Sequence, residues 1–170
     1  MKKHILFFSI LTLSFTLLGC GFYSFTGASI PPGTETFQVN YFENTADLVE
    51  PGLERDFKIE LEDLIQNQTN LNLVTSNGDL LYEGEITEYR ISPTNATAQN
   101  TAAQNRLTIT VKVNFYNRKK EDDNLENQSF SFFYDFSGSV QLVGSQKATA
   151  HEEILERLTQ DIFNATLAKW

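Results

Sequence analysis

The sequence predicts an α+β fold: a single β-α-β-β-β-α domain, with a four-stranded sheet and two helices packed on one face. Two observations lead to this prediction. Apolar residues alternate with polar ones along four segments, as in strands buried on one side. They recur every three or four residues along two longer segments, as in amphipathic helices. The chain has 170 residues, enough for one ordinary domain with its own core.

The first expected strand spans residues 36–42, and the first expected helix spans about residues 51–67. Alternation places three apolar residues of the strand on one side: Phe37, Val39 and Tyr41. Pro51 suits the first turn of a helix, because its missing N–H costs nothing there. The apolar face of the helix is formed by residues at spacings of three and four: Leu53, Phe57, Leu61, Leu64 and Ile65.

A second long strand is expected over residues 80–91, after a short extended piece at 70–74. The apolar residues of this strand change sides partway along it, which predicts a β-bulge near Thr87. Pro93 is expected to end the strand, because proline cannot donate to a sheet ladder. Residues 94–105 show no periodicity and are expected to form an exposed loop.

The third strand, residues 106–115, alternates without error, and the fourth, residues 130–136, has an aromatic face. The last helix is expected over about residues 148–169 and has a broad apolar arc. This arc consists of Ile154, Leu155, Leu158, Ile162, Phe163 and Thr166. With both helices on the apolar side of the sheet, the other side is left polar and available as a docking surface.

Residues 1–19 have the features of a secretory signal peptide. A cationic pair, Lys2 and Lys3, precedes an apolar run that is shorter than a bilayer-spanning helix and ends before Cys20. Cleavage is therefore expected. It leaves a Gly- and Pro-containing tether, residues 20–33, and a domain over residues 34–170.

Cys20 is the only cysteine of the chain, which excludes an intramolecular disulfide. The run Leu17-Leu18-Gly19-Cys20 resembles the lipobox of bacterial lipoproteins, in which the cysteine receives a diacylglycerol and becomes the first residue of the mature protein. Two or more acyl chains make a stable anchor, so we expect Cys20 to anchor the protein in a membrane. No acidic cluster follows Cys20, and we therefore place the mature protein at the outer membrane, on its periplasmic side.

The formal net charge of −9 argues against nucleic acid as a partner and against general adhesion to anionic membranes. The histidines, His4 and His151, cannot form a metal site or a nucleophilic pair in the mature chain, because His4 leaves with the signal peptide. We therefore predict no enzyme, no metal and no cofactor. A hydrolase that uses strand carboxylates remains an alternative, with Glu83, Glu85 and Glu88 as its candidates.

Three basic residues are candidates for an anion-binding surface: Arg90, Arg106 and Lys112. Arg90 has the opposite parity to the apolar residues beside it, and Arg106 and Lys112 share the polar side of the third strand. If the second and third strands pair, the three cations can form a positive patch on the open side of the sheet. Ordinary solvated charges are the alternative interpretation.

Three segments resemble the lipopolysaccharide-assembly lipoprotein family LptE, in the form found in Bacteroidota. Residues 20–31 read Cys-Gly-Phe-Tyr-Ser-Phe-Thr-Gly-Ala-Ser-Ile-Pro and are the most specific. Residues 106–111 read Arg-Leu-Thr-Ile-Thr-Val, and residues 161–170 begin Asp-Ile-Phe-Asn and end in Trp170. The order of elements along the mature chain also agrees with the family.

This resemblance implies a protein that binds and plugs the outer-membrane β-barrel LptD and assists lipopolysaccharide assembly at the cell surface. It implies no catalysis and no cofactor. Lipopolysaccharide contact through Arg90, Arg106 and Lys112 remains a hypothesis from strand parity. Two other interpretations stay open: a periplasmic lipoprotein adaptor of another secretion or β-barrel assembly machine, and a soluble binding module.

Overall fold

The structure is a computed structural model that describes residues 30–96, 102–138 and 141–168. The expected signal peptide, the predicted lipidation residue Cys20 and most of the expected tether lie outside the described residues. The elements follow one another in the order β1-β2-α2-β3-β4-β5-η2-β6-α3. This order confirms a mixed α+β fold with two helices.

In the described residues, one sheet contains six strands rather than the four expected from the sequence. They are β1 (Thr36–Val39), β2 (Glu43–Asn44), β3 (Asn72–Leu73), β4 (Leu80–Ala96), β5 (Ala102–Asn117) and β6 (Leu125–Ser137). The order across the sheet is β3-β1-β4-β5-β6, and β2 pairs with β4 beyond the end of β1. The strand count was wrong because β2 and β3 have two residues each, too few for any alternation to show.

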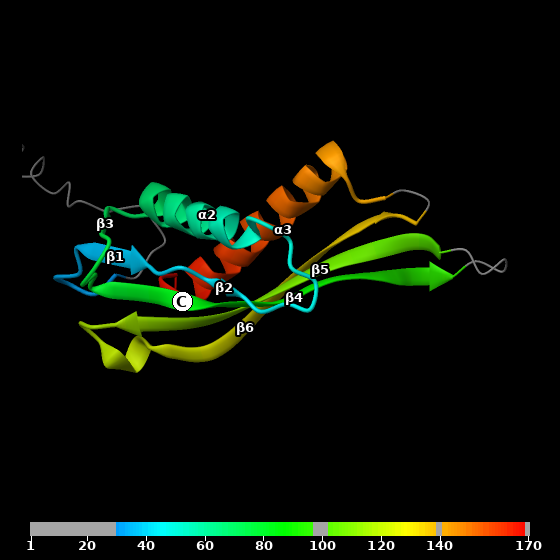
Figure 1. Cartoon of the computed structure of the whole chain (residues 1–170). Coiled ribbons are helices and arrows are strands. Elements are labelled where there is room, and N and C mark those ends of the chain that lie inside the picture. Colours follow the sequence, from blue (N-terminus) through cyan, green and yellow to red (C-terminus); the bar gives the residue numbers. More distant parts are fainter. Residues whose placement is uncertain (1–29, 97–101, 139–140, 169–170) are drawn as a thin grey trace, which may run out of the picture.

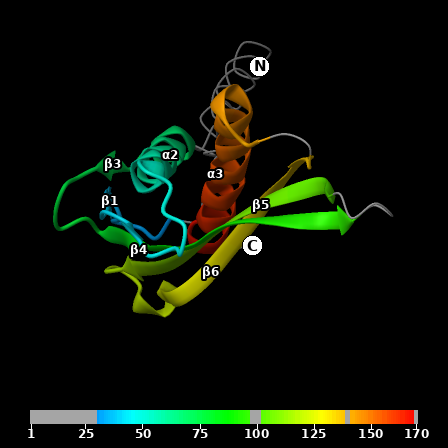
Figure 2. The ribbon, with the colours of Figure 1, turned by 45° about the vertical axis from the view of Figure 1, so that its right-hand side comes forward.

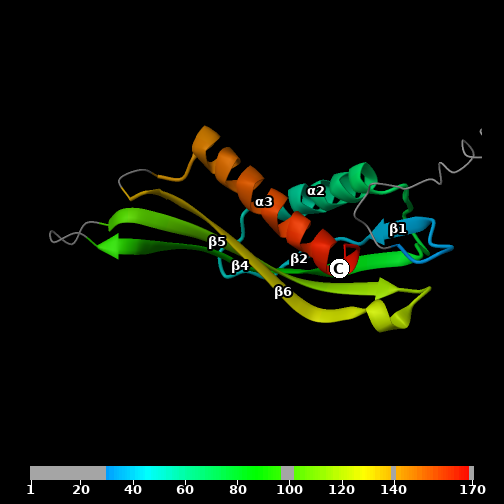
Figure 3. The same ribbon diagram turned by 180° about the vertical axis from the view of Figure 1, so that it is seen from behind.

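The two helices, α2 (Leu53–Gln68) and α3 (Gly144–Thr166), lie on the same side of the sheet (Figure 1), and the view from behind shows the same layering (Figure 3). Helix α2 begins after Gly52, whose φ of 86° is left-handed and cannot belong to the helix. Helix α3 begins four residues earlier than expected, because residues 144–147 carry no apolar side chain to reveal the helical period. A short 3-10 turn, η2 (Glu121–Asp123), connects β5 to β6.

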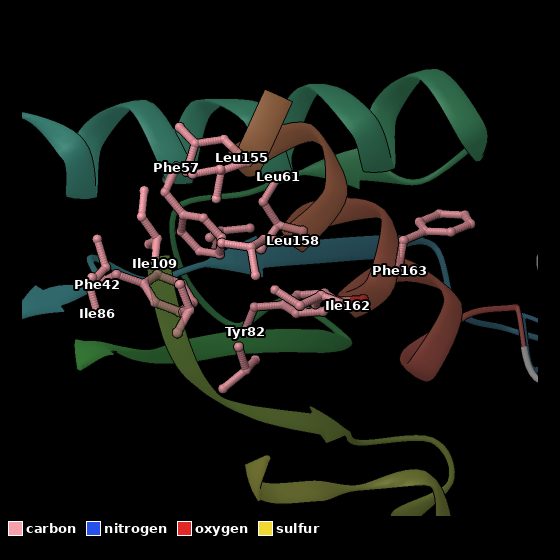
Figure 4. Packing of buried hydrophobic residues seen from close by; sticks show 14 of the residues in the cluster. Phe42, Phe57, Leu61, Tyr82, Ile86, Ile109, Leu155, Leu158, Ile162 and Phe163 are labelled. Atoms are coloured by element: carbon pink, nitrogen blue, oxygen red, sulfur yellow. The ribbon is translucent and has the colours of Figure 1, made fainter. Parts of the chain in front are cut away.

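The core fills the space between the helices and the sheet (Figure 4). The alternating residues of β5 and the apolar arc of α3 are all buried, as predicted. The prediction for the first strand was wrong at its end: Tyr41 is 65% exposed and Phe42 is buried instead, because β1 ends at Val39 and the alternation stops there. Phe42 meets Phe57 of α2 edge to face, with 4.8 Å between ring centroids. The Tyr82 hydroxyl lies 3.0 Å from Thr166 Oγ1, so its polar end is satisfied inside the core.

Strands β4 and β5 form a long hairpin that extends beyond the helices (Figures 1 and 2). The predicted bulge is confirmed, since the register shifts between Ile86 and Glu88. The expected end at Pro93 was wrong: Pro93 pairs with Asn105, and β4 continues to Ala96. Proline fits there because the pairing of β2 with β4 ends at Ile86, so Pro93 lies on an edge strand where no outward N–H is needed.

The prediction of a loop over residues 94–105 was therefore wrong at both ends of that range, where the residues belong to strands. Residues 94–96 belong to β4 and residues 102–105 belong to β5, while residues 97–101 lie outside the described residues. The run of Thr, Asn, Ala and Gln gave no alternation, and its described residues, 94–96 and 102–105, lie beyond the helices, where there is no core to cover (Figure 1).

Candidate functional site: the open face of the sheet

The open face is the side of β4, β5 and β6 that points away from the helices. On β5, the residues with this orientation are those between the buried ones, from Arg106 to Asn114. The register of β5 with its neighbours places the matching residues of β4 and β6 beside them. These side chains are Glu83, Glu85, Glu88, Arg90, Ser92, Arg106, Thr108, Thr110, Lys112, Asn114, Ser129, Ser131, Phe133 and Asp135. The face is therefore polar, with Phe133 as its one large apolar member among the residues named.

The three predicted cations all lie on the open face, but none of them offers an unpaired charge. Each forms an ion pair with a carboxylate of its own or a neighbouring strand. The pairs are Arg90 Nε with Glu88 Oε1 at 2.6 Å, Arg106 Nε with Asp135 Oδ1 at 2.7 Å, and Lys112 Nζ with Glu85 Oε1 at 3.1 Å. An anion that binds here has to compete with these carboxylates.

Arg90 and Arg106 line one open hollow of about 630 Å³, which we call the arginine hollow; its floor and walls include Thr108, Phe133 and Asp135. The Arg106 guanidinium carbon lies 3.5 Å from the centre of the Phe133 ring, within the range of a cation–π contact. Arg106 also donates from Nη2 to Asp135 Oδ2 at 2.8 Å, so the pair is bidentate. The Arg106 guanidinium therefore contacts the Phe133 ring and the Asp135 carboxylate at the same time.

Lys112 lies in a different part of the face. It is six residues from Arg106 along β5, about 20 Å at the usual rise of a strand. It borders a separate hollow of about 350 Å³ together with Glu83, Glu85 and Asn114. The structure thus brings two of the three predicted cations together and leaves Lys112 in a mostly acidic and amide environment.

The carboxylates proposed for a hydrolase also lie on the open face. They follow one another along β4 as Glu83, Glu85 and Glu88. Hydrogen bonds from Lys112 and Thr45 hold the pKa of Glu85 below its ordinary value. Hydrogen bonds from Arg90 and Thr110 do the same for Glu88. A general acid needs the opposite shift, so the environment favours permanent charge over proton transfer.

The sequence pointed to the cations and overlooked their neighbours Phe133 and Asp135. The alternation of the fourth predicted strand drew attention to its aromatic side, and these two residues belong to the other side. Their role depends on the pairing of Arg106 with Asp135 and of Thr108 with Phe133. Parity alone could have placed both on the open face; the register could not be read from the sequence.

Within the described ranges, no group of three or more His, Cys, Asp or Glu side chains is arranged to hold a metal ion. In the same part of the chain, none of the helices is both long enough and apolar enough to span a bilayer. Cys20, the predicted lipidation site, lies outside the described residues.

A family model described as "LptE: Lipopolysaccharide-assembly" matches residues 34–166. None of the curated proteins matches the chain. Among solved structures, an uncharacterized lipoprotein B from Nitrosomonas europaea is similar, with a TM-score of 0.56 and 12% identity, over 85% of this chain and 87% of that one. A hypothetical protein from Chlamydia trachomatis has a TM-score of 0.55 and 9% identity, over 80% and 99%. At such identities, these likenesses show the fold alone.

Proposed function

Because the chain belongs to the lipopolysaccharide-assembly family LptE, we propose that it is a lipid-anchored outer-membrane protein that binds and plugs an LptD-type β-barrel. In this position it assists the assembly of lipopolysaccharide at the cell surface. The observation that carries the proposal is the family match over residues 34–166, which includes every helix and strand of the described domain. The family consists of assembly lipoproteins rather than enzymes.

The open face supports the plug part of the proposal. Large outer-membrane barrels enclose a polar lumen, which in some of them is filled by a plug. A plug therefore needs a polar, well-paired surface rather than an apolar one. The open face meets this need, because its cations are paired with carboxylates within the face and most of its other side chains are hydroxyls and amides.

The arginine hollow is the part of the face that we propose for contact with lipopolysaccharide. Lipopolysaccharide carries phosphate groups, and the planar fork of arginine binds phosphate with two parallel hydrogen bonds. Arg90, Arg106 and Thr108 all line this hollow, which supports a contact in which the two arginines share one phosphate group. Lys112 would make a separate contact, six residues farther along β5 than Arg106.

The experiment that tests the proposed function is co-purification from native outer membranes. The full-length chain, tagged at its C-terminus and expressed in the bacterium that encodes it, is extracted in mild detergent. We expect one large β-barrel protein to co-purify in stoichiometric amount, and to resist removal by salt. Recovery of other secretion or envelope components without such a barrel would contradict the proposal and favour an adaptor role.

A further inference from the structure

The two outer edges of the sheet are built differently. On one side, the edge is formed by the two-residue strands β2 and β3, the four-residue β1 and the far part of β4. The exposed part of β4 contains the bulge after Ile86 and then Pro93. Short strands, bulges and proline are the usual means by which proteins prevent an edge from pairing with another chain. This edge is therefore protected.

The other edge is strand β6, which has an irregularity at its start near Asn127 and lacks these protections from Gln128 onward. Among the described residues, β6 is the last strand of the sheet and no strand pairs with its outer side. Its register with β5 is continuous from Gln128 to Ser137. Residues 128–136 contain no proline, glycine, lysine or arginine, and their one charged side chain, Asp135, is paired inward with Arg106. The edge is thus long, regular and without a charge that would repel an added strand.

Aromatic side chains along β6 remain incompletely covered. Phe130, Phe132 and Tyr134 point to the helix side but are only partly buried, although they pack against the core. Arg157 of helix α3 lies over Phe132, with its guanidinium carbon 5.4 Å from the ring centre. On the open face, Phe133 is 43% exposed. A strand added beside β6 would bury apolar surface on both sides of the sheet, in addition to gaining backbone hydrogen bonds.

We propose that the outer edge of β6 receives an extended segment of the β-barrel partner, which adds one more strand to the sheet. This inference rests on the proposed function. The segment has to lie outside the closed wall of the barrel, because the backbone groups of wall strands are already paired with each other. A flexible or terminal segment of the barrel chain has the backbone groups free to pair.

Strand β5 shows which chemistry fits beside β6, since it already occupies the inner side. It places Ile109 and Val111 opposite Phe132 and Phe130 on the helix side, and threonines on the open face. The added segment should alternate in the same way, with branched apolar residues toward the helices and small polar or basic residues toward the open face. A second copy of this chain is a poorer occupant, because each copy has a formal charge of −9.

Hydrogen exchange of the β6 backbone tests this proposal directly. Two samples in detergent are compared: the full-length chain alone, and the same chain in the complex purified with its barrel. Mass spectrometry of peptides from residues 128–136 measures the rate of amide exchange in each. In an edge strand, every second N–H points outward and exchanges with solvent. We expect these amides to exchange at least tenfold more slowly in the complex, while peptides from β5 stay protected in both samples.

Each other outcome overturns the proposal in a distinguishable way. If the barrel co-purifies but the β6 amides exchange as in the free chain, the edge proposal fails and the proposed function stands. If no barrel co-purifies, both fail together. If the β6 amides are slow in the free chain and their protection grows with protein concentration, a second copy occupies the edge instead.

A pair of variants gives an independent test. Ser129→Lys combined with Ser131→Lys adds guard lysines to the exposed side chains of β6, as natural edge strands do. Asn72→Lys adds a lysine to β3 on the protected edge and serves as the matched control. The melting temperatures of both variants are first checked to lie near that of the parent chain. We then expect the β6 variant to recover at least tenfold less barrel and the control to recover as much as the parent. Equal recovery by both variants would overturn the proposal.

Discussion

A single carboxylate holds three segments of the chain together at the end of the sheet near the start of the domain. Asp79 Oδ2 accepts hydrogen bonds from the backbone N–H groups of Glu35 and Thr36, at 3.0 and 3.1 Å. Lys119, in the turn after β5, lies 3.0 Å from its other oxygen. These donors hold the pKa of Asp79 at about 2, below its ordinary value of 3.8. Asp79 therefore stabilises the fold in its charged form.

We predict that Asp79→Asn lowers the free energy of unfolding by about 1 kcal/mol at pH 7, because an amide nitrogen cannot accept these bonds and the exposed part of the pair is screened. Since the pKa is lowered in the folded state, the contribution is fully present above the unfolded value of about 4 and is lost as pH falls through about 2. Urea unfolding of both proteins at pH 7 and pH 3 checks this. A difference that grows at the lower pH would contradict it.

At the arginine hollow, removing the arginines and removing the carboxylate of Asp135 should change the affinity for lipopolysaccharide in opposite directions. Replacing Arg90 and Arg106 together by alanine should weaken lipopolysaccharide binding at least tenfold, because both phosphate donors are lost. Asp135→Asn should strengthen binding severalfold, since it releases the Arg106 guanidinium without changing the shape of the hollow. Titration of labelled lipopolysaccharide at fixed ionic strength measures both.

The Lys112→Ala variant separates the hollow from the rest of the face, because Lys112 borders a different hollow. A smaller loss than that of the arginine pair is expected. Unchanged binding by the arginine pair, or loss of binding in Asp135→Asn, would show that the lipid binds elsewhere.

At the scale of elements, the close contact of β4 with β5 depends on one glycine. A Cβ on Gly84 would lie 2.0 Å from the Lys112 carbonyl oxygen and 2.9 Å from the Phe42 ring. Because the first of these atoms is backbone, the strands themselves would have to separate. We predict that Gly84→Ala destabilises the domain by about 3 kcal/mol. Ser129→Ala, at an exposed position of β6, should stay within about 0.5 kcal/mol of the parent chain; equal urea midpoints for the two variants would contradict the prediction.

The elements that the sequence predicted well are those with a long repeating pattern. Strand β5 has five alternating residues that are all buried, from Leu107 to Phe115, and the whole predicted arc of α3 is buried. The elements it missed have no such pattern. Strands β2 and β3 consist of two residues each, and residues 94–96 and 102–105 of the hairpin lie beyond the helices.

The candidate site was predictable in position but not in charge. Parity placed Arg90, Arg106 and Lys112 on one face, and the structure has them there. Whether they form a positive patch depends on which residues lie opposite, and the register of β6 is set by the turn between β5 and β6. That register puts Asp135 beside Arg106, and a charge-neutral pair replaces the exposed cation that the sequence suggested.

At the scale of the whole molecule, the anchor and the domain are expected to act separately. We predict that Cys20→Ala, combined with a signal peptide that is cut without a lipidation cysteine, reaches the periplasm but appears in the soluble fraction, because its single lipid attachment point is gone. The variant should retain affinity for the barrel in detergent extracts, since the domain is unchanged. Fractionation of cells followed by co-purification measures both. A variant that stays in the outer membrane in cells without the barrel would contradict lipid anchoring at this residue.

Depletion of this protein from the bacterium that encodes it tests the assembly role, with lipopolysaccharide then measured at the cell surface and in the inner membrane. If the chain supports assembly as a barrel-binding LptE protein, surface lipopolysaccharide should fall severalfold within a few generations. The amount of folded barrel should fall with it, and the parent gene should restore both. Normal surface lipopolysaccharide and a normal barrel in fully depleted cells would contradict the central claim.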